Sequence, residues 1–267
     1  MEIYTSCYNF GFYKSVPKLI SPKNGWVKLI QTFICLVFLY FHQKNKEYKT
    51  GAGASTESGI PDFRSANGLY ADAKVEMYLS RGYYNRNPKE FWKHYKEIFQ
   101  INTFHQYKPN RGHQFLASIE EQGKDIVVLT QNIDGLHQLG GSKHVIDLHG
   151  TLQTAHCPKC KTKYDLQYMI GHEVPRCETC NFILNPDVVL YGDTLPQYQN
   201  AIQRLYETDV LLVMGTSLKV QPVASFPQIA KREVGATTIL VNEELTGQEY
   251  YFDYIFQQKI GQFVDQF

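Results

Sequence analysis

Short apolar runs in the second half of the chain are each followed at once by polar residues. The runs occupy residues 126–130, 145–148, 210–214 and 238–241. Continuous apolar runs of this kind are typical of parallel strands that are buried on both faces of a sheet. Helical patterns at residues 197–207 and 223–233 lie between some of the runs. The alternation predicts an α/β fold.

The polar residues at the ends of these runs indicate one shared ligand site, because the ligand crevice of an open α/β sheet lies at the carboxyl edge. Taken singly, an asparagine or aspartate after a strand is more often a helix N-cap. His149 is the candidate general base, since histidine titrates near neutral pH. In chain order the polar residues are Gln131, Asn132, Asp134, His149, Thr216, Ser217, Asn242 and Glu243.

Residues 67–105 have a helical pattern with several aromatic side chains. Phe91, Trp92, Tyr95 and Phe99 recur at helical spacing. We expect this aromatic stripe to pack in a hydrophobic core.

The first 50 residues lack a clear helical or strand period. Residues 26–41 are mostly apolar, but Lys28 and Gln31 interrupt them. The run is shorter than the roughly 20 apolar residues that a membrane-spanning helix needs, and it lies late for a signal peptide. We expect a buried helix or strand here, and a membrane anchor is the alternative.

The charge balance narrows the range of partners. The 267-residue chain has 27 Lys and Arg against 26 Asp and Glu, which gives a net charge of +1. A near-neutral chain has no general electrostatic attraction to nucleic acid or to an anionic membrane, so we expect neither as a partner. We expect a cytoplasmic, monomeric protein.

Four cysteines form two Cys-x-x-Cys pairs, at Cys157, Cys160, Cys177 and Cys180. Two thiolate pairs at this spacing are typical of a tetrahedral zinc site of the zinc-ribbon type. Four cysteine ligands leave no position open for water or substrate. The sequence therefore predicts a structural zinc ion.

Residues 51–65 (GAGASTESGIPDFRS) begin as a glycine-rich loop. Glycines allow backbone N–H groups to approach a phosphate closely. Thr56 stands where the dinucleotide fingerprint has its third glycine, which disfavours a standard nicotinamide dehydrogenase. The following Asp62, Phe63 and Arg64 place a carboxylate, a ring and a guanidinium in one loop, which is a more specific signal than the glycines.

Taken together, these motifs resemble those of the sirtuin family, the NAD-dependent protein deacylases, and in particular its bacterial members. The resemblance runs from about Thr50 to the C-terminus and includes TQNIDGLH, LHG, NPDVVLYGD, GTSLKVQPVA and LVNEE. It implies a Rossmann-like domain and a smaller domain of helices and a zinc ribbon, with the active site between them. It also implies that NAD is consumed to deacylate lysines of protein substrates, releasing nicotinamide and O-acyl-ADP-ribose. His149 would be the general base that acts on a ribose hydroxyl.

The same resemblance implies, from the positions of the motifs, which residues bind NAD and which bind the peptide. The NAD-binding residues would be Ala52, Gly53, Thr56, Asp62, Phe63, Arg64, Gln131, Asn132, Ile133, Asp134, Gly215, Thr216, Ser217, Asn242, Glu243 and Ile260. The acylated peptide would add a strand by main-chain hydrogen bonds, against Val189, Leu190, Tyr191, Gly192, Leu218 and Val220. The implied domains are a divergent segment 1–49 and a catalytic domain 50–267, whose Rossmann-like parts are 50–66, 107–152 and 184–267, with a helical part 67–106 and a zinc module 153–183.

Sirtuins that prefer acidic acyl groups carry a Tyr-x-x-Arg pair in the helical region. Trp92 and Tyr95 occupy those positions here. No guanidinium is then placed to pair with a succinyl carboxylate. The resemblance therefore implies a preference for acetyl or longer apolar acyl groups.

The chain departs from the family just before the glycine loop. A buried apolar strand is expected there, but Lys44, Lys46, Glu47 and Lys49 occupy this stretch, and charged side chains are costly to bury. Three explanations are open. Residues 29–41 replace the expected strand, or the strand is missing, or this end of the chain does not reflect the ancestral reading frame. We hypothesise impaired folding or weak NAD binding. Two alternatives stay open, a degenerate paralogue that binds NAD or acylated peptide, and a mono-ADP-ribosyltransferase on the same scaffold.

Overall fold

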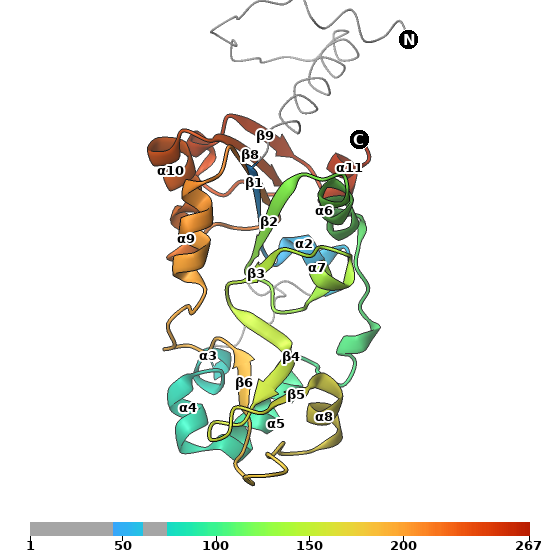
Figure 1. Ribbon diagram of the computed structural model, residues 1–267, viewed down its shortest axis with the longest axis vertical. Coiled ribbons are helices and arrows are strands. Elements are labelled where there is room, and N and C mark those ends of the chain that lie inside the picture. The colour runs from blue at the N-terminus through green and yellow to red at the C-terminus, as the bar shows by residue number, and fades with distance from the viewer. Residues whose placement is uncertain (1–44, 61–73) are drawn as a thin grey trace, which may run out of the picture. The chain divides into compact units, whose positions relative to one another are not determined.

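Six parallel strands form the main sheet of the described residues (Figure 1). The computed structural model describes residues 45–60 and 74–267. The strand order is β3-β2-β1-β7-β8-β9, and every neighbouring pair is parallel. The strands are β1 (Asn45–Thr50), β2 (Asp125–Thr130), β3 (Val145–Asp147), β7 (Val210–Met214), β8 (Thr237–Asn242) and β9 (Tyr254–Gln257). The predicted α/β class is confirmed, and each of the four predicted strands is present.

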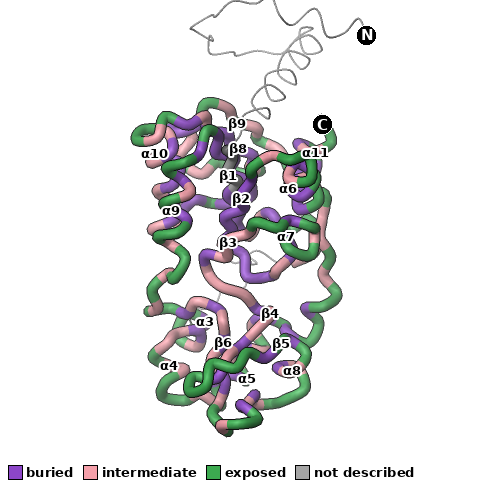
Figure 2. The backbone as a smooth tube through the Cα atoms, viewed as in Figure 1, coloured by how far each residue is buried: buried purple, intermediate pink, exposed green. Residues whose placement is uncertain are grey.

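Helices cover both faces of this sheet, and successive strand residues alternate between the two layers. Val128 and Leu212 pack with α6 (Arg111–Glu121) and α11 (Ile260–Val264), on one side of the sheet. Leu129 and Val213 pack on the other side, among the residues of α9, α10 and η3. The helices on that side are α9 (Tyr198–Tyr206), α10 (Phe226–Ile229) and the π-helical turn η3 (Ala230–Val234), preceded by the 3₁₀ turn η2 (Val223–Ser225). Because both faces are covered, β2 and β7 have the continuous burial that their apolar runs predict (Figure 2), whereas β3, at one edge of the sheet, is only half-buried.

A smaller lobe carries the zinc-ribbon motif and the aromatic helix. Its sheet has the order β5-β4-β6, with β4 (Gly150–His156), β5 (Lys163–Asp165) and β6 (Asn185–Val188) antiparallel. Its helices are α3 (Lys74–Tyr78), α4 (Arg81–Arg86), α5 (Pro88–Ile98) and α8 (Leu166–Gly171). Phe91, Trp92 and Tyr95 of α5 are fully buried in one core, which confirms that the aromatic stripe is core packing.

The remaining described elements are short and lie in the connections. The short helices α2 (Gly53–Thr56) and α7 (Leu136–Leu139) follow β1 and β2. The 3₁₀ turns η1 (Phe104–Gln106) and η4 (Glu249–Tyr251) precede α6 and β9. α2 begins three residues after β1 ends and α7 begins six residues after β2 ends, so both lie at the carboxyl edge of the sheet.

The charged segment before the glycine loop is itself the central strand of the sheet. β1 pairs over its full length with β2 and also pairs with β7. The expectation that a segment with these charges cannot act as the first strand is therefore wrong. Main-chain hydrogen bonds define a strand whatever its side chains are, and β1 has a partner on both sides. The apolar run at residues 26–41, expected as a buried element or a substitute strand, lies outside the described residues.

Lys49 shows how one of these charged side chains is accommodated. It is fully buried, and its Nζ donates a hydrogen bond to Val223 O at 2.6 Å and lies 5.4 Å from the centre of the Phe226 ring. Burial lowers the pKa of Lys49 from 10.5 to about 7. Between these pH values the unfolded chain holds a proton that the folded protein releases. Stability therefore rises with pH across this window, and at neutral pH the buried amine destabilises the fold.

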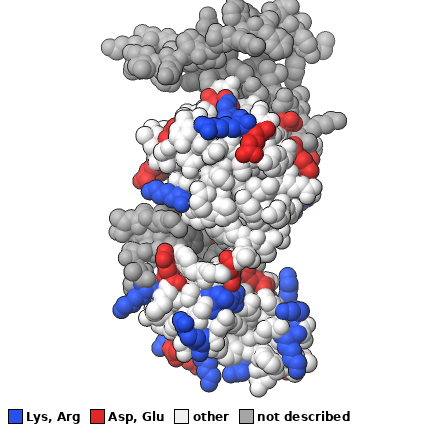
Figure 3. Space-filling model, turned by 90° about the vertical axis from the view of Figure 1, so that its left-hand side faces the viewer, with Lys and Arg blue, Asp and Glu red and all other residues white. Residues whose placement is uncertain are grey.

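The surface of the described residues has two further features that bear on partners. Among residues 45–60 and 74–267, no helix has both the length and the apolar character that crossing a bilayer requires. On the face shown in Figure 3, the described Lys and Arg side chains lie among Asp and Glu side chains, without one continuous patch of a single sign. This mixture agrees with the near-neutral net charge.

We expect Lys49→Met to raise the melting temperature at pH 7. A methionine fills similar space without an amine. It therefore avoids the free-energy cost of burying the amine, which reaches about 5 kcal/mol for a pKa shift of this size. The loss of the hydrogen bond to Val223 O costs less, about 1–3 kcal/mol. Thermal unfolding measured from pH 7 to pH 10 checks this, because the gain should shrink as the pH rises. Lys108→Met, at an exposed lysine, is the control, and a gain that is independent of pH contradicts the account.

Candidate active site

A single large cavity collects most of the residues that the sequence predicts for NAD and peptide. Its volume is about 1380 Å³, larger than the roughly 300–1,000 Å³ typical of a site for one small ligand. The predicted residues that line it are Ala52, Gly53, Thr56, Gln131, Asn132, Ile133, His149, Val189, Leu190, Tyr191, Gly192, Gly215, Thr216, Ser217, Val220, Asn242, Glu243 and Ile260. The polar clusters that follow four separate strands thus meet at one place, as expected for the carboxyl edge of a parallel sheet.

A few predicted residues stand apart from this lining. Asp134 and Leu218 are buried next to lining residues but do not line the cavity themselves. Asp62, Phe63 and Arg64 lie outside the described residues. Trp92 and Tyr95, which the resemblance places at the acyl-selective positions, are buried in the core of the smaller lobe.

The loops after β1 and β7 pack against each other backbone to backbone. Gly53 N donates to Gly215 O at 2.8 Å. A Cβ atom at Gly53 would lie 2.8 Å from that oxygen, and a Cβ at Gly215, where φ is +58°, would lie 2.4 Å from Ala54 N. Glycine is therefore required at both positions by contact between the loops themselves. The result is a cradle lined by main chain, which suits a phosphate-containing ligand.

Asn132 lies in the wall of the cavity, and a buried hydrogen-bond network fixes its side-chain amide. Its Nδ2 donates to Ser55 Oγ at 2.9 Å, and Ser55 Oγ donates in turn to Asp134 Oδ2 at 2.7 Å. Asn132 Oδ1 is buried and has no hydrogen-bond partner among the described residues. A buried acceptor of this kind is costly unless a ligand or water satisfies it.

Asp134 supports this arrangement from behind the cavity. Its Oδ1 accepts from Leu136 N at 2.9 Å, and its own O accepts from Gln153 Nε2 at 3.0 Å. Burial raises the pKa of Asp134 above its usual value, while the hydrogen bonds from Ser55 and Leu136 oppose this. The carboxylate therefore fixes Ser55, and through it Asn132, without lining the cavity.

Two buried histidines form the layer beneath this network. His137 Nε2 lies 2.8 Å from Thr50 Oγ1, and His113 Nδ1 accepts from Asn110 N at 3.2 Å. Burial lowers the pKa of His113 to about 4 and that of His137 to about 3. Both rings are neutral at pH 7, so they support the site by packing and hydrogen bonding and leave the proton chemistry to another group.

His149 is the histidine that reaches the cavity. Its Nδ1 lies 3.1 Å from Gln131 O. Because a carbonyl oxygen can only accept, the neutral ring carries its proton on Nδ1 and its lone pair on Nε2. Gly150 follows with φ +75°, and a Cβ there would lie 1.9 Å from Asp187 O. The backbone next to His149 thus tolerates only glycine.

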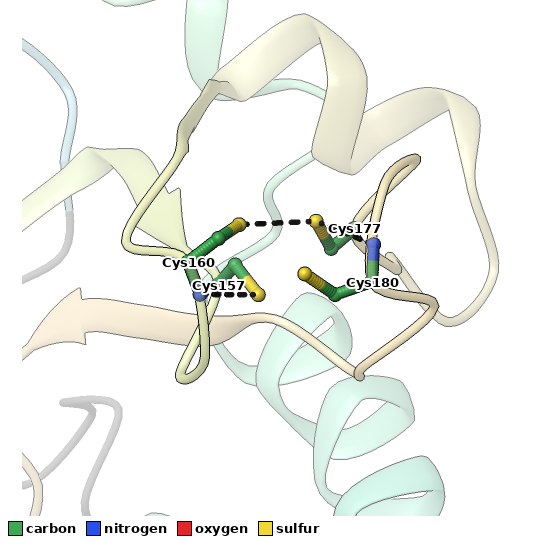
Figure 4. A group of neighbouring side chains, drawn as sticks. All are labelled: Cys157, Cys160, Cys177 and Cys180. Atoms are coloured by element: carbon green, nitrogen blue, oxygen red, sulfur yellow. Dashed lines mark hydrogen bonds between the residues drawn. The ribbon is translucent and has the colours of Figure 1, made fainter.

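The four cysteines converge in the smaller lobe (Figure 4). Their sulfur atoms all lie within 4.8 Å of one another, and Cys160 Sγ and Cys177 Sγ are 3.5 Å apart. Tetrahedral zinc with bonds of about 2.3 Å needs sulfur atoms about 3.8 Å apart, whereas a disulfide needs about 2.05 Å. The cluster can therefore hold a zinc ion, and none of its members lines the large cavity.

The two halves of the cluster have the same local structure. Lys161 N donates to Cys157 O at 3.0 Å, and Asn181 N donates to Cys177 O at 2.8 Å. Both Lys161 and Asn181 adopt positive φ, +63° and +55°. Each Cys-x-x-Cys turn thus points two sulfur atoms at the other turn. These turns explain why the spacing alone predicts the site.

Several lining residues were not assigned to the site from the sequence. Leu79, Phe99 and Val188 give the cavity an apolar part, and Asp193 and Lys219 add charge at its wall. Leu79 belongs to no motif and Phe99 was expected only in a core. The other three lie within the motifs NPDVVLYGD and GTSLKVQPVA, whose neighbouring residues were assigned. Glu57 could have been noticed, since it lies inside the glycine-loop motif.

Comparisons with known proteins point the same way as the geometry. A sequence model of the Sir2 family matches residues 51–222. A Bacillus cereus protein named NAD-dependent protein deacetylase is 91% identical over 216 residues, 81% of this chain and 89% of that protein. A Geobacillus kaustophilus protein named NAD-dependent protein deacetylase 2 is 51% identical over 217 residues, covering 80% and 88%. A solved structure of Sir2 with a peptide and NAD+ has a TM-score of 0.73 at 34% identity, covering 86% and 95%.

We expect Cys177→Ser to abolish stoichiometric zinc binding and to lower the melting temperature by at least about 10 °C, because structural zinc contributes directly to folding. Metal analysis of the purified protein and thermal unfolding measure the two effects. Lys163→Ser, at an exposed residue of the same lobe, is the control and should retain both zinc and stability. A serine variant that keeps one zinc ion per chain would count against a four-cysteine site.

Proposed function

Because the chain belongs to the Sir2 family and is an NAD-dependent protein deacetylase, we propose that His149 is its general base and that NAD binds along the carboxyl edge of the sheet. One observation carries this proposal. His149, whose ring is oriented by Gln131 O, lines the same cavity as the glycine loops after β1 and β7. A base beside a backbone-lined cradle suits a reaction at a phosphorylated sugar.

The residues of the cavity have different roles in the reaction. Bound NAD supplies the ribose carbon that the acyl oxygen attacks, and nicotinamide is the group that leaves. His149 Nε2 takes the proton from a ribose hydroxyl, which its lone pair allows only while Nδ1 donates to Gln131 O. Asn132 lines the cavity beside the sugar, and Ser55 and Asp134 keep its amide in place.

The two halves of NAD are assigned to two groups of residues. For the nicotinamide half we propose Ala52, Gly53, Thr56, Gln131, Asn132, Ile133 and Asp134, together with Asp62, Phe63 and Arg64 from outside the described residues. For the adenosine half we propose Gly215, Thr216, Ser217, Asn242, Glu243 and Ile260. The support is that the described members lie along consecutive strand ends of one sheet edge, with Asp134 behind the lining.

The acylated peptide is assigned to two segments, Val189–Gly192 and Leu218–Val220, all of whose residues except Leu218 line the cavity. Leu218 has its side chain in the core and a φ of +53°, so it would act through its backbone. Recognition by main chain tolerates many sequences, which suits an enzyme that acts on proteins. The four cysteines would hold structural zinc, and thiols kept reduced for zinc favour a cytoplasmic location.

The central test is nicotinamide release from NAD, measured with and without an acetyl-lysine peptide. We expect release that depends on the peptide, and a loss of at least about a hundredfold in His149→Ala, since a general base contributes about 10²–10⁴. His105→Ala, at an exposed histidine, should leave the rate unchanged. ADP-ribose attached to protein would instead indicate a transferase. A folded, zinc-loaded protein that releases no nicotinamide would indicate a binding protein.

We expect acetyl to be removed at least about ten times more efficiently than succinyl from one peptide sequence, because an unpaired carboxylate is costly to bury. Leu79, Phe99 and Val188 line the cavity, and its described cations are Lys219 and Lys259, neither of which offers the two-pronged contact of an arginine. The ratio of kcat/KM values for the two acyl groups measures the preference. Faster removal of succinyl would contradict it.

A further inference from the structure

The segment that we assign to the peptide is held in place by an arginine from another part of the chain. Arg81, the first residue of α4, donates from Nε to Asp193 Oδ1 and from Nη2 to Asp193 Oδ2, both at 2.8 Å. The third nitrogen, Nη1, donates to Asn185 Oδ1. The guanidinium thus joins the first residue of β6 to the residue that follows Gly192.

Main-chain contacts reinforce this connection. Arg81 N donates to Tyr191 O at 2.9 Å, and Tyr191 N donates to Leu79 O at 3.0 Å. Asp193 Oδ2 also accepts from Leu190 N at 3.0 Å. The same carboxylate oxygen therefore meets both the guanidinium and the backbone of the segment. Loss of Arg81 would leave this carboxylate without the partner that orients it.

The geometry distinguishes this pair from ordinary surface ion pairs, most of which contribute little. The Arg81 and Asp193 side chains are only 26% and 21% exposed. Their hydrogen bonds form a two-pronged fork, the strongest arrangement of an arginine and a carboxylate, and the Tyr84 ring lies 5.2 Å from the guanidinium carbon. Although burial opposes it, hydrogen bonding from Arg81 holds the pKa of Asp193 below its usual value. The pair is thus charged at neutral pH.

We propose that Arg81 is a positioning residue for the acylated peptide, acting through Asp193 on the conformation of residues 189–192. The proposal rests on the function proposed above for this segment. Arg81 itself is absent from the described lining of the cavity, whereas Asp193 and the segment it caps are part of it. Arg81 would therefore affect how the peptide binds and leave the NAD-binding edge of the sheet unchanged.

The test compares Arg81→Ala, Arg81→Lys, Asp193→Ala and the Arg81→Ala/Asp193→Ala double variant in the full chain. With the peptide and NAD varied separately, we expect Arg81→Ala to raise the KM for an acetyl-lysine peptide about tenfold, the scale of one lost charged contact. The kcat and the KM for NAD should stay within about twofold. Lysine should recover part of the loss, since it keeps the charge but lacks the fork. The double variant should be no worse than the worse single variant.

Arg86→Ala is the matched control, because Arg86 is an exposed arginine on the same helix. Binding of a fluorescent acetyl-lysine peptide, measured by anisotropy, repeats the comparison without turnover. This measurement separates the positioning role of Arg81 from the catalytic role proposed for His149. If the wild-type protein is inactive but binds peptide in a way that depends on Arg81, only the catalytic role is overturned. An unchanged peptide affinity in folded Arg81→Lys and Arg81→Ala, or an equal rise of both KM values, overturns the positioning role.

Discussion

The active site depends on the parallel pairing of β1 between β2 and β7. Thr50 is paired with Thr130 on one side and with Met214 on the other, so these three strands end at the same level. The next residues continue the alignment, with Gly51 N donating to Met214 O and Gln131 N donating to Thr50 O. The glycine loop that begins at Gly51, the polar residues 131–134 and the loop that begins at Gly215 therefore start side by side. Shifting β1 by one residue would break all three relations at once.

His149 and Gly150 connect this edge to the smaller lobe. His149 is tied through its ring to Gln131 O, and its own O accepts from Val189 N at 2.8 Å. One residue therefore links the strand end that would bind the sugar to the segment that would bind the peptide. At the next residue only glycine fits, because a Cβ at Gly150 would lie 1.9 Å from Asp187 O in the smaller lobe. Zinc can stabilise the rest of the lobe from a distance, because its four cysteines lie outside the cavity.

The sequence predicted what depends on local pattern. Apolar runs located the strands 210–214 and 126–130, and the cysteine spacing located the sulfur cluster. It did not predict β1, because the hydrophobic pattern does not report main-chain pairing. Nor does the pattern show that the Val223 carbonyl and the Phe226 ring accommodate the buried Lys49 side chain. It also missed Arg81 and Asp193, which are 112 positions apart and acquire a shared role only when α4 meets the end of the segment 189–192.

The family match and the structure together explain how a charged strand can precede an intact site. The Sir2 match begins at residue 51, the first residue after β1. The site needs from β1 chiefly the position of its carboxyl end, which the main chain provides through its partners on both sides. Thr50 also contributes a side chain, through its contacts with Thr130 and His137. The unfavourable burial of Lys49 thus affects the stability of the sheet. The residues that line the cavity begin only at Ala52, three residues further along the chain.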